Sequence, residues 1–299
     1  MKKSNTNKQS FILAALLLLS GLLSGCIRED NTDCPRPFRL FVKAVDIDLQ
    51  DITESGEVKQ VFLFVYNEKG ELIQSIELDA DFIKNRKAVP IELPYPGFEA
   101  LHFVAWGNVN DDVNFDKSDL DVTLKDIGAG IAGSPSDLFY GTLNVPVEYG
   151  GIEAAGDQTV VIHRKTSQVV ITANGLKKWN GNKDGEYTYR LTESHNTIDG
   201  KGELTGPMVG YNPNAVMDIN GNLGAAPFRT FPTTGGKTYT LEILYNGEVI
   251  YTATEGTDGV KFVPEVGRLL NIYIDFRAEV GIYVAISPWD VVHQFVVIG

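Results

Sequence analysis

Short runs of apolar residues, separated by glycine, proline and asparagine, recur along most of this chain. Residues 60–66 and 71–78 are rich in β-branched and aromatic side chains and flank a four-residue turn that ends in glycine. Such runs fit a pleated, half-buried surface, and their spacing predicts a β-hairpin. Residues 237–245 and 248–254 flank Asn246-Gly247, a dipeptide strongly favoured in two-residue hairpin turns, and predict a second hairpin.

Other apolar runs extend the same pattern to the C-terminus. We expect further strands at residues 101–106, 159–163, 168–173, 269–276, 282–286 and 291–298. Helical spacing is weak and confined to residues 79–87. Many short strands with turn residues between them favour an all-β fold of packed sheets over alternating strands and helices. A near-halving of the strand count predicts two domains, residues 38–164 and 165–299.

One long stretch of the second half has no clear strand pattern. Gly200 to Gly236 is rich in glycine, proline and asparagine. We expect a surface loop between strands, although long loops in compact domains are often functional.

The N-terminus has the layout of an export signal. Three lysines precede an apolar run of about 13 residues, which is shorter than the roughly 20 needed to span a bilayer as a helix. The run ends in Leu23-Ser24-Gly25-Cys26, which resembles the lipobox of bacterial lipoproteins. That resemblance implies a signal peptide at residues 1–25 and lipid on Cys26. An ordinary signal peptide followed by a chance cysteine is the alternative.

A charged stretch follows the cysteine. Arg28, Glu29 and Asp30 lie in a tether at residues 26–37, and the stretch resembles the surface-export signal of Bacteroidetes lipoproteins. A plain solvated tether explains the same composition.

Charge and cysteine content narrow the function classes. The net charge is −13, and removal of residues 1–25 takes away three lysines and no acid, which leaves −16. Because an acidic chain repels phosphate backbones, we expect no nucleic-acid partner. Cys26 and Cys34 are the two cysteines, so the chain has no disulfide framework. Cys34 is either a thiol or part of an intermolecular bridge.

The catalytic and metal-binding patterns in the sequence are incomplete, so we expect no enzyme activity, metal or cofactor. Residues 128–133 match G-x-G-x-x-G, but Pro135 discourages the helix that a dinucleotide site needs, so we expect a flexible loop. The acidic stretch 108–121 lacks the glycine and glutamate of a calcium-binding EF-hand loop, so we expect a solvated loop. The four histidines lie far apart in sequence, and no G-x-S-x-G is present. A carboxylate pair for sugar hydrolysis stays open, because the chain has 39 acids.

Several stretches together resemble the fimbrillin-associated anchor family of Bacteroidetes, the Mfa2/FimB-like lipoproteins. These stretches are, in chain order, Cys26 with Glu29-Asp30, Asp33-Cys34-Pro35, Val61 to Tyr66, His102 to Asn108, Asp137 to Gly141, Val161 to Lys165, Val169 to Ala173, and Trp289. The resemblance implies two transthyretin-like β-sandwich domains, residence on the surface side of the outer membrane, and a role at the base of a fimbrium. It also implies assembly by donor-strand exchange, in which a strand of one subunit completes the sheet of another.

The C-terminal run is the candidate strand for such an exchange. Val291, Val292, Phe295 and Val297 are its candidate contacts with a fimbrial shaft or minor subunit, and an ordinary internal strand is the alternative. A surface glycan-binding lipoprotein is the second hypothesis for the whole protein, with Trp179 as its one plausible exposed aromatic residue. A secreted hydrolase is the third.

Overall fold

The computed structural model describes residues 32–93, 97–150 and 153–295, and strands dominate them. The all-β fold predicted from the sequence is confirmed. A short helix, α2 (Ala80–Lys84), lies within the stretch that has weak helical spacing, and a second one, α3 (Leu176–Trp179), has no such signal. Two single 3-10 turns, η1 (Thr53–Ser55) and η2 (Thr234–Gly236), complete the helical elements of these residues.

The first half of the chain forms one sheet of seven strands. Their order is β3 (Leu72–Asp79), β2 (Gln60–Asn67), β5 (Ala100–Gly107), β10 (Phe139–Pro146), β11 (Asp157–Arg164), β1 (Phe38–Val45) and β4 (Val89–Ile91). β1 is parallel to β11, and all other neighbours are antiparallel. The predicted hairpin at residues 60–78 is confirmed as β2–β3.

This sheet folds over on itself between β10 and β11. β10 pairs with β5 along its whole length but with β11 only at its first two residues. A Cβ at Gly141 would lie 2.0 Å from the carbonyl oxygen of Val161, so glycine is needed where the two strands separate. Beyond that point the two parts of the sheet face each other, and the ring of Phe38 on β1 meets that of Phe103 on β5 edge-on, with centroids 6.0 Å apart. An apolar core drawn from β1, β2, β5 and β11 fills the space between them.

The second half is a sandwich of two sheets. The first has the order β15 (Ala215–Met217), β16 (Leu223–Thr230), β12 (Ser167–Asn174), β19 (Arg268–Asp275) and β20 (Gly281–Pro288). The second has the order β18 (Glu248–Ala253), β17 (Thr240–Tyr245), β13 (Tyr187–Ile198), β14 (Leu204–Tyr211), β9 (Ile131–Ala132) and β8 (Asp126–Gly128), with β7 (Asp121–Leu124) on β13 and β6 (Val113–Asp116) on β7. The predicted hairpin around Asn246-Gly247 is confirmed as β17–β18.

Residues 113–132 connect the two halves. They lie inside the proposed N-terminal domain, yet β7 pairs with β13 and β9 with β14. The ring of Phe115 also packs on Phe62, on the outer face of the first sheet, with centroids 5.7 Å apart. As a result, Trp106 of the first half and Val169 of the second belong to one apolar cluster. The boundary after residue 164 and the transthyretin-like topology stay predictions.

Three sequence expectations about loops are wrong. The acidic stretch 108–121 is not a plain solvated loop, because it contains β6 and buries Val113 and Leu120. The stretch from Gly200 to Gly236 is not an irregular loop, because it contains β14, β15 and β16. Most of β14 faces solvent, so it lacks the apolar alternation by which a half-buried strand is recognised. Residues 128–133 are not a flexible loop either, since β8 and β9 form a small hairpin there, with Ala129 and Gly130 at positive φ in its turn.

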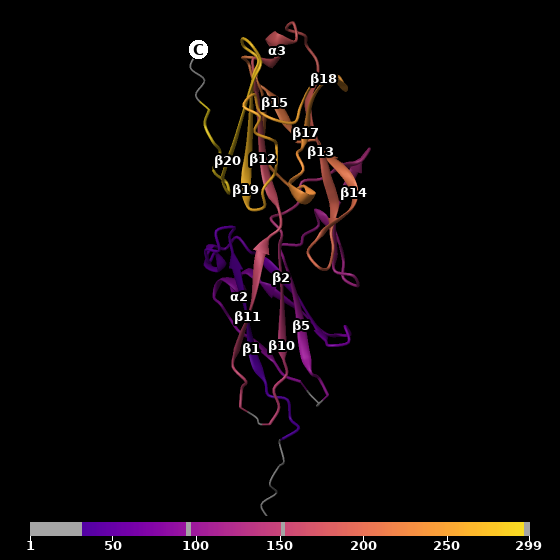
Figure 1. The fold of residues 1–299 in the computed structure, drawn as a ribbon, viewed down its shortest axis with the longest axis vertical. Coiled ribbons are helices and arrows are strands. Elements are labelled where there is room, and N and C mark those ends of the chain that lie inside the picture. The colour runs from indigo at the N-terminus through magenta and orange to yellow at the C-terminus, as the bar shows by residue number, and fades with distance from the viewer. Residues whose placement is uncertain (1–31, 94–96, 151–152, 296–299) are drawn as a thin grey trace, which may run out of the picture.

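The two halves lie end to end along the long axis of the molecule. Figure 1 shows the N-terminal half below, in indigo and magenta, and the C-terminal half above, in orange and yellow. Residue 32, where the described chain begins, lies at the lower end, and α3 lies at the upper end. Near this end Pro35 forms a bridge to Tyr149, and the Arg36 guanidinium pairs with the Glu148 carboxylate at 2.9 Å.

Candidate functional site

The C-terminal segment does not form the strand predicted for it. After β20 the chain turns at Trp289 and Asp290, where Asp290 has a φ of +59° and the Val291 N–H donates to the Pro288 carbonyl at 3.1 Å. Residues 291–295 then continue without strand pairing. The internal strand that the sequence offered as an alternative is therefore absent over 291–295, and Val297 lies outside the described residues.

Side chains of the underlying sheet hold this segment instead of a backbone ladder. The Gln168 amide donates to the Asp290 carboxylate at 2.6 Å and accepts from the Asp290 N–H at 3.1 Å. Further along, the His293 N–H donates to the Asn271 side-chain oxygen at 2.8 Å. Phe295 stacks on Tyr273, with ring centroids 5.4 Å apart. The segment therefore crosses the outer face of β12, β19 and β20.

Asn271 on β19 shows that the outer face of this sheet is complementary to the C-terminal segment. Its side chain points away from the sandwich core yet is only 1% exposed. Its amide nitrogen donates to the Ser287 hydroxyl at 2.9 Å, which leaves its oxygen for the segment. A buried amide costs free energy unless it is hydrogen-bonded, so the segment completes a site that would otherwise be unsatisfied.

Part of the segment remains open to solvent. Val291 is 52% exposed and Val292 is 49% exposed, while Phe295 is partly covered. Three of the four predicted subunit-binding residues thus lie together on one surface strip, and their side chains are not used in the sandwich core.

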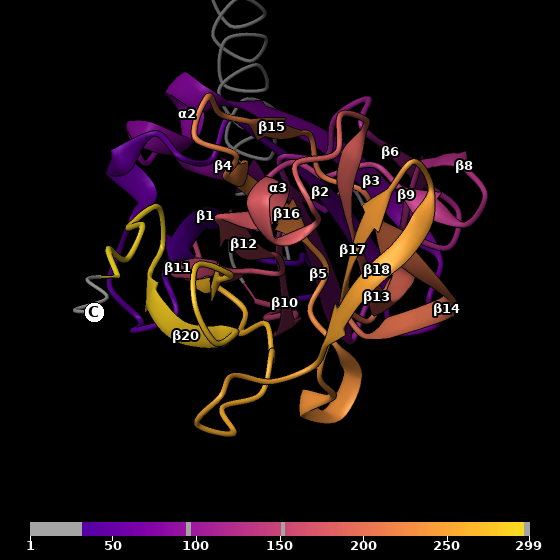
Figure 2. The ribbon, with the colours of Figure 1, turned by 90° about the horizontal axis from the view of Figure 1, so that it is seen from above.

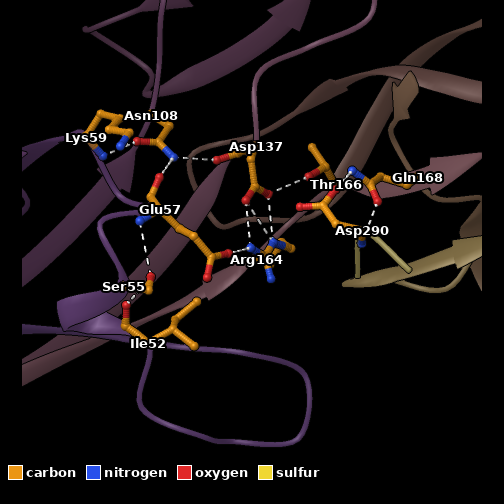
Figure 3. Close-up of polar contacts among 10 residues, drawn as sticks. All are labelled: Ile52, Ser55, Glu57, Lys59, Asn108, Asp137, Arg164, Thr166, Gln168 and Asp290. Carbon is orange, nitrogen blue, oxygen red and sulfur yellow. Dashed lines mark hydrogen bonds and ion pairs between the residues drawn. The ribbon is translucent and has the colours of Figure 1, made fainter. Parts of the chain in front are cut away.

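Below the turn lies a buried ion network at the junction of the two halves. Figure 3 shows Arg164, at the end of β11, reaching the carboxylate of Asp137 and the carboxylate of Glu57. The Arg164 Nε atom lies 2.8 Å from Asp137 Oδ1, and the Thr166 hydroxyl donates to the same oxygen at 3.0 Å. Burial raises the pKa of the Asp137 carboxyl group, and the hydrogen bonds from Arg164 and Thr166 oppose that rise.

Trp289 joins the C-terminal segment to this network. Its ring lies 4.1 Å from the guanidinium carbon of Arg164 and 5.9 Å from that of Arg229, which are cation–π distances. The two stretches that contain Asp137 and Arg164, and Trp289 itself, carry the sequence resemblance, but the sequence alone assigned none of them a role. The structure brings all three together.

The other candidate chemistry does not converge. His102 lies in β5, with its Nδ1 atom 2.6 Å from the Asn144 side-chain oxygen, and His195 lies in β13, bonded to the Gly206 carbonyl at 2.8 Å. Within residues 32–93, 97–150 and 153–295, no three His, Cys, Asp or Glu side chains are grouped as a metal site. In the same ranges, no helix has the length and apolar content to cross a membrane.

Cys26, Arg28, Glu29 and Asp30 lie outside the described residues. Cys34, which follows them, is exposed, and its carbonyl accepts from the Gly150 N–H at 3.2 Å.

The described residues thus form an all-β protein with a buried ion network between its two halves and a C-terminal segment held by side chains. Comparison with known proteins gives the family. Residues 31–295 match the family described as fimbrillin-A associated anchor proteins Mfa1 and Mfa2, and the chain belongs to that family.

One relative and one solved structure agree with this assignment. The major fimbrium anchoring subunit FimB of Porphyromonas gingivalis is 40% identical over 303 residues, which cover 97% of this chain and 99% of FimB. The fimbrial anchor protein Mfa2 from Porphyromonas gingivalis has the same fold, with a TM-score of 0.61 and 15% identity over 86% of this chain and 98% of that one. The sequence-based recognition of the family is confirmed, and a role as a fimbrial anchor follows from it.

Proposed function

We propose that this protein is an outer-membrane lipoprotein that anchors a fimbria and binds a fimbrial subunit by donating its C-terminal segment as a strand. The observation that carries the proposal is the way residues 290–295 are held. They are attached through a few side-chain bonds and one ring stack, and they have no strand partner.

Strand donation would exchange those few bonds for a full backbone ladder. A strand added to an open sheet edge gains regular main-chain hydrogen bonds, and its alternate side chains fill pockets on the acceptor. The apolar residues Val291, Val292, Phe295 and Val297 supply such side chains. Because the present contacts of Val291, Val292 and Phe295 lie outside the core, these residues can leave without unpacking the sandwich.

The polarity of the molecule supports an anchoring role. The described chain begins at residue 32, at the lower end in Figure 1 and six positions after the proposed lipid on Cys26. The segment instead runs up the outer face of β19 toward Tyr273 in the upper half. A membrane would then lie at one end of the long axis, and the fimbrial subunit would bind at the other.

The first sheet supports a place at the base of the fibre. β1 lies between β11 and β4 and matches β11 through seven residue pairs, so the position beside β11 is already filled by a strand of the chain itself. The side chain of Arg39 in β1 also makes a double hydrogen bond to Asp157, at 2.7 and 2.8 Å. A chain that donates one strand and accepts none would end a fibre, and the proposed lipid makes that end the base.

The glycan-binding alternative receives little support from the tryptophans. Trp106 is fully buried, Trp289 lies between arginines, and Trp179 lies on α3 at the upper end. Glycan platforms present aromatic rings side by side on the surface, and of these three rings only Trp179 is exposed.

A binding assay with purified fimbrial shaft subunit tests the proposal. The mature lipoprotein in detergent is compared with a variant that lacks residues 291–299 and with Phe295→Ala. We expect truncation to raise the Kd about 100-fold or more and Phe295→Ala to raise it about 10-fold. Leu72→Ser, at an exposed position of β3 in the other half, serves as the control and should bind as the unaltered chain does. Full binding by the truncated chain would contradict strand donation.

A further inference from the structure

Two large apolar side chains stand exposed at the upper end of the molecule. Trp179, the last residue of α3, is 40% exposed, and Ile219, in the turn between β15 and β16, is fully exposed. In Figure 2, which looks down on this end, α3 lies near the centre of the face with β15 beside it. We call the surface formed by Trp179, Ile219 and the neighbouring Tyr251 the distal cap.

The tryptophan is held in place by other rings. Its ring centroid lies 4.7 Å from that of the buried Phe276 and 6.1 Å from that of Tyr251. Tyr251 and Phe276 also contact each other edge-on at 5.1 Å. A ring supported on two sides loses little conformational freedom on binding, so Trp179 is preorganised to contact a partner.

The isoleucine is held by a hydrogen-bonded turn. The Asp218 carboxylate accepts from the N–H groups of Asn220 at 2.8 Å and Asn222 at 2.9 Å, which fixes the turn with Ile219 at its tip. Turns usually carry glycine, asparagine or aspartate, because these residues suit the backbone and the solvent. A β-branched apolar residue at such a position has no packing role in the free protein.

The turn and the helix form one rigid unit. The Lys177 N–H on α3 donates to the Gly221 carbonyl at 3.0 Å, and the Gly175 N–H before α3 donates to the Asn222 side chain at 2.8 Å. Trp179 and Ile219 therefore keep a fixed relation to each other.

The cap is continuous with the donated segment. Phe295 stacks on Tyr273, and the Tyr273 hydroxyl accepts from the Asn174 side chain at 2.8 Å. Asn174 immediately precedes Gly175, the N-cap residue of α3. A subunit that binds the segment at Phe295 thus lies next to the strand end that leads into the cap.

We propose that the distal cap is a second contact surface for the same fimbrial subunit, whose apolar hollow receives the side chains of Trp179 and Ile219. This proposal rests on the proposed function. The occupant is a protein because Ile219 adds an aliphatic group beside the ring, whereas sugar sites combine aromatic rings with convergent polar groups. A few buried aromatic and aliphatic anchors dominate the affinity of such interfaces. The cap would set the angle between anchor and fibre, and the segment would supply the strand.

Binding of purified shaft subunit to Ile219→Ser and Trp179→Ala tests the cap, with the mature lipoprotein in detergent and the segment intact. We expect each variant to raise the Kd about 10-fold. Ile219→Ser changes a fully exposed side chain, so the fold is retained, and thermal unfolding checks Trp179→Ala. Leu72→Ser is the control.

The outcomes separate the two proposals. If truncation of residues 291–299 abolishes binding while both cap variants bind like the unaltered chain, the cap proposal is wrong and strand donation stands. If the unaltered chain does not bind shaft subunit, strand donation fails and the cap proposal falls with it. Retention of cell-surface polysaccharide by the unaltered chain, lost in Trp179→Ala, would assign the cap to sugar instead.

Discussion

The two halves of the molecule finish their sheets in different ways. The N-terminal half folds one sheet around its own core, and its edge strand β3 carries Glu77 and Asp79. The edge strand β20 of the C-terminal half has no charged residue, and the sheet beside it is covered by a loosely attached segment. Charges on an edge strand discourage pairing with other chains. The comparison suggests that the first half is closed and the second half is built to engage a partner.

The largest effect on the free energy of unfolding is expected at the Arg164–Asp137 ion network, which joins the two halves. In Asp137→Ala the Arg164 guanidinium keeps its charge in a buried place without its main partner. Removing one member of a buried pair typically costs about 3–5 kcal/mol, and we expect that decrease in the free energy of unfolding. Urea denaturation measures it. Arg36→Ala breaks the more exposed pair with Glu148 and should cost less than about 1 kcal/mol. Equal costs for both variants would mean that the joint does not depend on this network.

The second-largest effect is expected where the first sheet bends between β10 and β11. Gly141→Ala places a methyl group against the Val161 carbonyl, so β10 and β11 must move apart, and we expect a loss of about 1–3 kcal/mol. Gly224→Ala in β16 is the matched control, because a Cβ there meets no atom within 4 Å. Thermal denaturation of both variants decides whether the close approach limits stability. Unchanged thermal stability of Gly141→Ala would show that the sheet bends elsewhere.

The attachment of the C-terminal segment gives a smaller effect. Gln168→Ala removes both hydrogen bonds to Asp290 and leaves the sandwich core intact. Each net hydrogen bond contributes about 1 kcal/mol, so the loss of two should make the segment detach about 30-fold more often. Hydrogen exchange at the His293 amide measures this, with Gln74→Ala on exposed β3 as the control. Unchanged exchange would mean that the Asn271 hydrogen bond and the ring stack of Phe295 hold the segment without Gln168.

The smallest effect is a pH dependence confined to the N-terminal half. Burial disfavours the charge on Asp51, but hydrogen bonds from Thr53 and the ion pair with Arg86 outweigh it and hold its pKa at about 2, below its usual 3.8. A lowered folded-state pKa gives stability that is present above pH 3.8 and is lost as the pH falls toward 2. Asp51→Asn should therefore flatten the fall in stability between pH 4 and pH 2, as measured by urea denaturation. An unchanged slope would contradict the role of this carboxylate.

Sequence patterns predicted the strands that have one apolar face. Both hairpins and the strands around residues 101–106 and 168–173 follow from alternating or β-branched runs. β14 was missed because most of its residues face solvent, and a strand without a buried face leaves no apolar period. Local apolar patterns could not predict the pairing of β1 with β11, since register between distant strands depends on tertiary packing.

The candidate site was found in part. The apolar character of residues 291–295 identified the segment, but the same character predicted a strand. The turn at Asp290, with its positive φ, and the bonds from Gln168 and Asn271 decide otherwise, and no local pattern announces them. The Arg164 network joins residues more than a hundred positions apart, so spacing could not reveal it.

The most direct test measures whether the anchor and the fibre stay in the membrane or enter the medium when one of two attachments is removed. The two attachments are the proposed lipid on Cys26 and the C-terminal segment. Fimbrial subunit and anchor are assayed in membrane and medium fractions of the native cell for Cys26→Ala and for truncation of residues 291–299. We expect Cys26→Ala to release fibres with the anchor attached, and the truncation to release fibres while the anchor stays in the membrane. Fibres that remain on the cell in both variants would contradict a protein that links the outer membrane to a fimbria.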